Sequence, residues 1–180
     1  SGDSVLEFTP ATATFNGQPL QYEGVEGVFF SDVQFVTYAV PDAENEIRIG
    51  RPVGEDIILR GTVDGQPTAV YTFDVPGRIS TLTVQGDEGP DHLTLGHTSG
   101  LDPIPGSGII FHGAGQPPES EDVLEILGGT FNQVRYSYES ASDGSINLSD
   151  RNVTYTRLKP IFNSGSSSTI LFNLTDLDDE

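Results

Sequence analysis

The chain has 180 residues, with 27 Asp and Glu against 8 Lys and Arg, no Cys, and a formal net charge of −19 at pH 7. Such an acidic chain repels the phosphates of nucleic acids and of anionic membranes, so neither is expected as a partner. The lack of Cys excludes disulfide bonds, zinc–thiolate sites and thiol catalysis. No run of about 18 apolar residues is present, so membrane insertion is not expected.

Short segments of alternating apolar and polar residues follow one another along the chain, and 21 Gly and 12 Pro are spread between them. A period of two is the signal of a β-strand, because successive side chains point to opposite faces. No window keeps the i, i+3, i+4, i+7 spacing of an amphipathic helix. The expected strands are 5–9, 13–16, 20–23, 33–38, 46–49, 56–61, 69–73, 80–85, 92–96, 108–112, 122–127, 133–138, 145–148, 152–157 and 169–173.

Many short strands at close spacing are typical of an all-β sandwich, barrel or solenoid. A partial internal repeat, 5–28 with 134–161, favours the solenoid. Leu20, Tyr22, Val25 and Val28 correspond to Val153, Tyr155, Leu158 and Ile161 at an offset of 133 residues (153 − 20). We therefore interpret residues 1–180 as a single domain, a fragment of a larger repeat protein that holds one long repeat and the start of the next. A chance alignment of two strand-rich stretches is the alternative explanation.

Two Gly- and Asp-containing turns, 86–91 and 113–122, separate strands in the middle of the chain. The first fits the calcium-binding pattern GGxGxDxUx, except that Asp87 replaces the second Gly. In such turns Gly permits a positive φ, and the Asp carboxylate supplies a hard oxygen ligand. The sequence therefore offers Asp87, Asp91 and Asp122 as candidate Ca²⁺ ligands, with no other cofactor expected. An insertion breaks the spacing in the second turn, and a metal-free tight turn with Asp91 bonded to nearby backbone N–H groups is the alternative.

The stretches Asp143-Gly144-Ser145-Ile146-Asn147-Leu148 and Val153-Thr154-Tyr155-Thr156-Arg157-Leu158-Lys159-Pro160-Ile161 follow the strand–Gly/Asp turn–strand units. Together these segments resemble a recurring module of very large secreted proteins from planctomycetes and related aquatic bacteria. Residues 157–159 depart from the family's usual Gly-Leu-Glu, which leaves the local turn open. The resemblance covers most of the chain and implies a right-handed parallel β-helix whose coils bury apolar side chains against one another. An antiparallel β-sandwich remains the alternative fold.

The same resemblance implies a non-enzymatic structural or adhesive module of a secreted or cell-surface bacterial protein. Its partners would be adjoining repeats of the same chain and polysaccharide of the cell surface or matrix. A carbohydrate-binding module is a first alternative, in which Tyr136, Tyr138 and Tyr155 form an exposed aromatic platform. These Tyr side chains could equally stack in an internal ladder.

A polysaccharide-cleaving β-helix is a second alternative, because acid–base cleavage needs two positioned carboxyl groups. The candidates for this role are Asp87, Asp91, Asp122, Glu125, Arg135 and Arg157. Asp91 and Asp122 occupy the same place in the two turns, so stacking of coils would bring them close. No known motif surrounds any of these residues, so we expect no enzyme. His92, His97 and His112 are expected to face solvent or accept ordinary hydrogen bonds.

Overall fold

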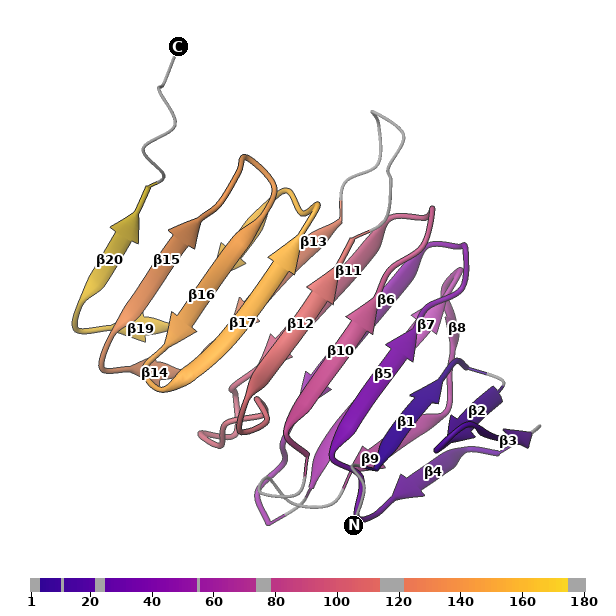
Figure 1. Cartoon of the computed structure of the whole chain (residues 1–180). Coiled ribbons are helices and arrows are strands. Elements are labelled where there is room, and N and C mark those ends of the chain that lie inside the picture. The colour runs from indigo at the N-terminus through magenta and orange to yellow at the C-terminus, as the bar shows by residue number, and fades with distance from the viewer. Residues whose placement is uncertain are drawn as a thin grey trace.

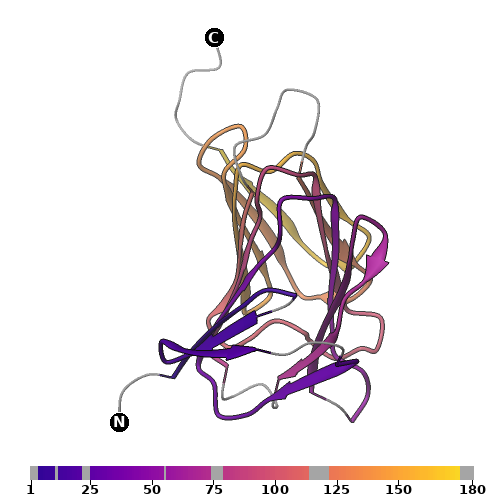
Figure 2. The same cartoon turned by 90° about the vertical axis from the view of Figure 1, so that its right-hand side faces the viewer.

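The computed structural model describes residues 4–10, 12–21, 25–54, 56–73, 79–113 and 122–174. Every secondary-structure element in these ranges is a β-strand, which confirms the prediction of an all-β fold. No helix long and apolar enough to cross a membrane occurs in these ranges. Two large sheets face each other, and a two-stranded sheet lies between their ends (Figures 1 and 2).

The first large sheet has ten strands, in the order β20-β15-β16-β17-β12-β10-β5-β1-β2-β3. Its strands are β1 (Val5–Phe8), β2 (Thr12–Phe15), β3 (Gln18–Gln21), β5 (Phe35–Ala39), β10 (Thr81–Gln85), β12 (Gly108–His112), β15 (Val134–Tyr138), β16 (Gly144–Leu148), β17 (Arg151–Thr156) and β20 (Ile170–Asn173). The strands β3 and β20 form its two edges, at opposite ends of the molecule in Figure 1.

The second large sheet has the order β18-β13-β11-β6-β7-β9-β4, with β8 paired to β7 outside this path. Its strands are β4 (Gly27–Phe30), β6 (Asn45–Gly50), β7 (Ile57–Val63), β8 (Gln66–Pro67), β9 (Val70–Phe73), β11 (Asp91–Gly96), β13 (Val123–Leu127) and β18 (Ile161–Asn163). The small third sheet pairs β14 (Thr130–Phe131) with β19 (Ser166–Ser167).

The chain passes repeatedly from one large sheet to the other. The strands β5, β10, β12 and β17 are parallel neighbours in the first sheet, and β6, β11, β13 and β18 are parallel neighbours in the second. Antiparallel strands are added at three places, namely β1–β3, β7–β9 and β15–β17. Both sheets are therefore mixed, and parallel pairing joins the successive passes of the chain.

Every strand that alternation predicts overlaps an observed strand. The observed β4, β8, β14, β18 and β19 were not predicted. Four of these have two residues or an uninterrupted apolar run, so they carry no period-two pattern to detect. The fifth, β18, has three residues directly after Pro160.

The core consists of rows of apolar side chains that run across the strands between the two sheets. Register places Leu6, Val36, Leu82, Ile109 and Val153 in one row, and Phe8, Tyr38, Val84, Phe111 and Tyr155 in the next. Facing them, the second sheet contributes Ile47, Leu93 and Leu124, followed by Ile49, Leu95 and Ile126. All of these side chains are buried. Burial of this kind contributes about 1.5–3 kcal/mol for each large side chain.

Leu82 lies in the middle of its row, fully buried between Val36 and Ile109. We expect Leu82→Ala to lower the free energy of unfolding by about 2–5 kcal/mol, because packed neighbours cannot collapse into the space. Urea unfolding followed by circular dichroism measures this change. Thr83→Ala, on the outer face of the same strand, is the control and should change stability by less than about 0.5 kcal/mol. Equal losses in both variants would contradict the inward orientation of Leu82.

Candidate functional site

Three polar side chains lie side by side where the chain enters the second sheet, and we call them the polar corner: Asn45, Asp91 and Asp122. Asn45 and Asp91 are the first residues of β6 and β11 and are paired in register. Asp122 directly precedes β13, whose Val123 pairs with His92 of β11. All three are buried. The stacking expected of Asp91 and Asp122 from their equivalent turns is thus present.

Hydrogen bonds run through the polar corner from one pass of the chain to the next. Asn45 Nδ2 donates to Asp91 Oδ1 at 2.7 Å and to two carbonyl oxygens of its own turn at 2.8 and 3.0 Å. Asp91 N donates to Asp122 Oδ1 at 2.9 Å, and Asp87 N donates to Asp91 Oδ2 at 3.3 Å. Each side chain thereby satisfies backbone groups that the turn would otherwise bury unpaired.

Gly86 and Gly113 hold equivalent positions beside the two carboxylates. A Cβ atom at Gly86 would collide with Asp91 Oδ2, and one at Gly113 would collide with Asp122 Oδ2. Neither glycine has φ in the left-handed region, and Gly89 does not have it either. The expectation that these glycines supply a positive φ is therefore wrong. Gly86 and Gly113 are needed because the carboxylates approach the backbone closely, and Gly89 because the backbone of Ala43 does.

The pKa of Asp91 is raised to about 7, first because burial disfavours the charged carboxylate and also because Asp122 lies beside it. The hydrogen bond from Asn45 opposes this rise, because it favours the ionised form. A raised pKa means that the folded protein holds this proton more tightly than the unfolded chain does.

The candidate calcium ligands are only partly brought together. Asp91 and Asp122 meet in the polar corner, whereas Asp87 joins it through its backbone N–H, and its carboxylate accepts a bond from Glu88 N at 2.9 Å. Both carboxylate oxygens of Asp91 accept N–H donors, which a bound Ca²⁺ would have to replace. Within the residues that the structure describes, no three His, Asp or Glu side chains are grouped to hold a metal ion. Calcium binding stays a prediction.

The three candidate ligand-binding Tyr residues do not share one exposed face. Tyr155 is buried in the inward row, where burial raises the pKa of its hydroxyl to about 12. Tyr136 is half-buried. Its ring stacks on Phe172 at 5.2 Å, and its hydroxyl accepts a bond from Asn163 Nδ2 at 2.9 Å. Tyr138 is also half-buried. Tyr155 thus belongs to an internal ladder and not to a surface platform.

The groups named for acid–base cleavage are dispersed. Asp91 and Asp122 lie in the buried corner, whereas Glu125 accepts a hydrogen bond from Thr94 Oγ1 at 3.2 Å and lies 3.6 Å from His92 Nε2. Arg135 Nη2 donates to Gln133 Oε1 at 3.3 Å, at the start of β15. Arg157 donates its backbone N–H to Asp143 Oδ1 at 2.8 Å. The described side-chain contacts bring neither guanidinium group to the polar corner, although the Arg157 backbone carbonyl lies beside Gly113.

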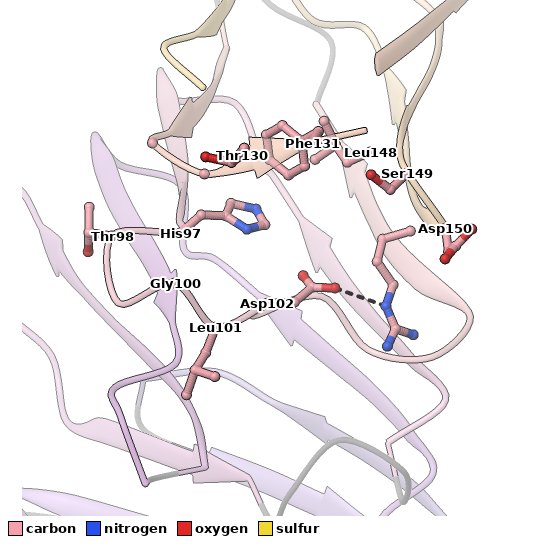
Figure 3. A pocket seen from close by; sticks show the side chains of 13 residues that line it. His97, Thr98, Gly100, Leu101, Asp102, Thr130, Phe131, Leu148, Ser149 and Asp150 are labelled. Carbon is pink, nitrogen blue, oxygen red and sulfur yellow. Dashed lines mark hydrogen bonds and ion pairs between the residues drawn. The ribbon is translucent and has the colours of Figure 1, made fainter. Parts of the chain in front are cut away.

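A groove of about 740 Å³, which sequence reasoning missed, opens beside the loop after β11 (Figure 3). Asp102 and Arg151 form an ion pair in it, with Nε and Oδ2 2.9 Å apart. His97 is buried against the edge of the Phe131 ring at 5.2 Å, and burial lowers its pKa, which favours the neutral imidazole. Asp102 and Arg151 are 49 residues apart in sequence, so no motif could have indicated their pairing.

A second hollow, of about 450 Å³, gathers Arg48, Arg51 and Arg60 on the outside of the second sheet, and we call it the arginine hollow. Arg48 and Arg60 are direct cross-strand neighbours between β6 and β7. Neither forms an ion pair with a residue of the described part of the chain. Like charges placed opposite each other are destabilising, so the arginine hollow favours an anion.

The third histidine takes part in an ordinary hydrogen bond. His112 Nδ1 lies 2.9 Å from Thr156 Oγ1, its neighbour in register on β17. Neither residue lines the groove or the arginine hollow. The expectation of a hydrogen-bonded histidine is therefore confirmed at this position.

The raised pKa of Asp91 predicts how stability depends on pH. Because the folded-state pKa of about 7 exceeds the unfolded value of 3.8, the contribution of Asp91 is most favourable below about pH 4 and is lost as pH rises through 7. We expect Asp91→Asn to flatten the decline in unfolding free energy between pH 4 and 8, measured by urea titrations at several pH values. Asp87→Asn, in the same turn, is the charge-matched control. An identical slope in both variants would show that Asp91 does not retain its proton.

Comparison with known proteins returned no matching family model, no matching curated protein and no matching solved structure.

Proposed function

We propose that the chain is a non-enzymatic structural or adhesive module of a large repeat protein outside the bacterial cell, built as a two-sheet parallel β-helix. The observation that carries the proposal is the parallel, in-register addition of one strand to each sheet at successive passes. A sandwich assembled from hairpins would place antiparallel neighbours at these positions. The antiparallel strands β1–β3, β7–β9 and β15–β17 are then insertions into the coils.

The polar corner supports this interpretation, because it recurs at the same point of successive coils. Asn45, Asp91 and Asp122 each stand where a pass through the second sheet begins. Two hydrogen bonds link them, one from Asn45 to Asp91 and one from Asp91 to Asp122. These bonds go to the backbone of the turns and to one another, which suits a structural role. Two carboxylates that face solvent across a cleft, as glycoside cleavage requires, would have favoured an enzyme.

Stiffness is the property that this arrangement would contribute to a larger protein. Each coil contacts its neighbours through continuous rows of buried side chains, and repeat proteins of this kind draw stability from such nearest-neighbour interfaces. The net charge of −19 keeps the outside solvated. The extracellular location rests on the resemblance of the central and C-terminal segments to modules of secreted bacterial proteins.

Hydrogen exchange on a matched pair of variants tests the coil architecture. Val36 and Val153 are buried in the same row, in β5 and β17. In a β-helix, Val153→Ala should speed amide exchange about tenfold in β15–β18 and leave β5 and β6 almost unchanged, because the two lost methyl groups weaken the local interfaces. Val36→Ala should do the reverse. Uniform acceleration across the chain in both variants would refute independent coils.

Binding of acidic polysaccharide is a second candidate function, favoured by the arginine hollow, which gathers three positive charges locally on a chain whose net charge of −19 opposes polyanions elsewhere. If the hollow serves this role, polygalacturonate should bind saturably, and Arg48→Gln with Arg60→Gln should weaken binding at least about tenfold. Calorimetric titration at two salt concentrations measures this, since contacts between charges weaken as salt rises. Tyr136→Ala, on the other sheet, is the control variant. Absence of binding by the unsubstituted chain would leave the structural role alone.

A further inference from the structure

The first and last strands of the chain form two units with the same connectivity. In the first unit, β1 pairs antiparallel with β2, β2 with β3, and β5 returns to lie parallel to β1. In the last unit, β15 pairs with β16, β16 with β17, and β20 returns to lie parallel to β15. Between these strands the chain visits the second sheet once in each unit, through β4 and β18. The two units are duplicates in topology.

Register extends the correspondence to single residues. Leu6 and Val134 are buried residues of β1 and β15, and they pair with Val36 of β5 and Ile170 of β20. Tyr38 and Phe172 correspond in the same way, two residues further along. The sequence offset of these pairs is 134 residues (170 − 36), close to the offset of 133 in the preceding strands. Leu174 therefore corresponds to Val40.

The equivalent residues of the two units differ in whether a further strand covers them. In the first unit Val36, Tyr38 and Val40 are 1%, 2% and 5% exposed, and β10 pairs with the outer side of β5. In the last unit Ile170, Phe172 and Leu174 are 55%, 62% and 72% exposed, and β20 is the edge of its sheet. An apolar edge strand of this kind is a template for another strand. We call the alternating residues Ile170, Phe172 and Leu174 the open edge. They repeat the apolar alternation of the buried residues in β5, but β20 has no neighbouring strand equivalent to β10 in the described part of the chain.

We propose that the open edge receives the strands β6–β10 of a following copy of this module, joined in register so that a residue equivalent to Val40 follows Asn173. The proposal deepens the proposed function and rests on it, since it names the partner as a second copy of the module. In that arrangement β20 takes the place of β5. The strand equivalent to β10 pairs with the edge of β20 that faces away from β15. Phe162 stays uncovered, because its counterpart Phe29 is 60% exposed in the first unit.

Charge favours a following copy in the same chain over a separate molecule. Two separate copies would each bring a net charge of −19 to the interface and repel each other. A covalent connection overcomes this, because it raises the effective concentration of the second copy at the edge. The in-register junction also follows from the chain itself, since Ala39 leads directly into Val40 in the first unit.

A tandem fusion tests the proposal: residues 1–173 joined directly to residues 40–180, compared with the single chain by amide hydrogen exchange. The amides of β20 should exchange at least about a hundredfold more slowly in the fusion, which is the effect of burying two further apolar side chains. A shorter fusion, residues 1–173 joined to 40–113, gives the same readout if the longer one is insoluble. Unchanged exchange of β20 in a folded fusion would overturn the proposal.

Two exposed residues supply matched variants within the fusion. Ile170→Asp should return the β20 amides to their single-chain exchange rates and should have little effect on the single chain, where Ile170 is exposed. Phe162→Asp, at a residue that is 54% exposed, should leave exchange slow in the fusion. Slow exchange in the Ile170→Asp fusion would show that the protection arises elsewhere and would refute the open edge. If the fusion gives no protection of β20, only the pairing with a following copy is refuted. The coil architecture is tested separately, by the exchange pattern of the single chain.

Discussion

The structure depends on parallel strand pairing, which places equivalent residues of successive passes of the chain beside one another in register. Every inward position becomes part of a row, so an apolar residue in one strand packs on apolar residues in the neighbouring parallel strand. This explains why the rows through Leu82 and Val84 cross the parallel strands of the first sheet without a polar interruption. The same rule places Asp91 beside Asp122, although their turns differ in length. Sheet pairing and core packing are thus one constraint.

Sequence reasoning could identify most strands, because alternation is a local property that needs no knowledge of partners. It also predicted that Asp91 and Asp122 would meet, since their turns are equivalent. It could not assign their chemistry, because that depends on burial and on the amide of Asn45, which lies 46 residues from Asp91 in sequence. The prediction that Tyr136, Tyr138 and Tyr155 form an exposed platform was wrong for a similar reason, since Tyr155 is buried. Alternation tells which residues share a face of a strand, but it does not tell which face meets the opposite sheet.

The groove lay beyond sequence reasoning, because its Asp102–Arg151 pair joins residues 49 apart that only the fold brings together. The arginines of the arginine hollow are near in sequence, but only the antiparallel pairing of β6 with β7 shows that Arg48 and Arg60 are direct neighbours. The repeat of residues 5–28 with 134–161, in contrast, was visible in sequence and recurs as the shared connectivity of β1–β5 and β15–β20. Repeated sequence survives as repeated topology because each unit packs the same pattern of side chains. The two units differ on their outer side, because β10 covers β5 whereas β20 is an edge strand.

The polar corner has a consequence for how neighbouring parallel strands stay aligned. Inward residues recur every two positions along a strand, so a slip of two residues against a neighbour keeps apolar side chains facing the core. Such a slip would move the Asp91 carboxylate out of the reach of Asn45 Nδ2 and into apolar surroundings, where an uncompensated charge is costly. The corner therefore selects one alignment of the neighbouring parallel strands β6, β11 and β13. A few buried polar atoms make the rest of an apolar stack unambiguous.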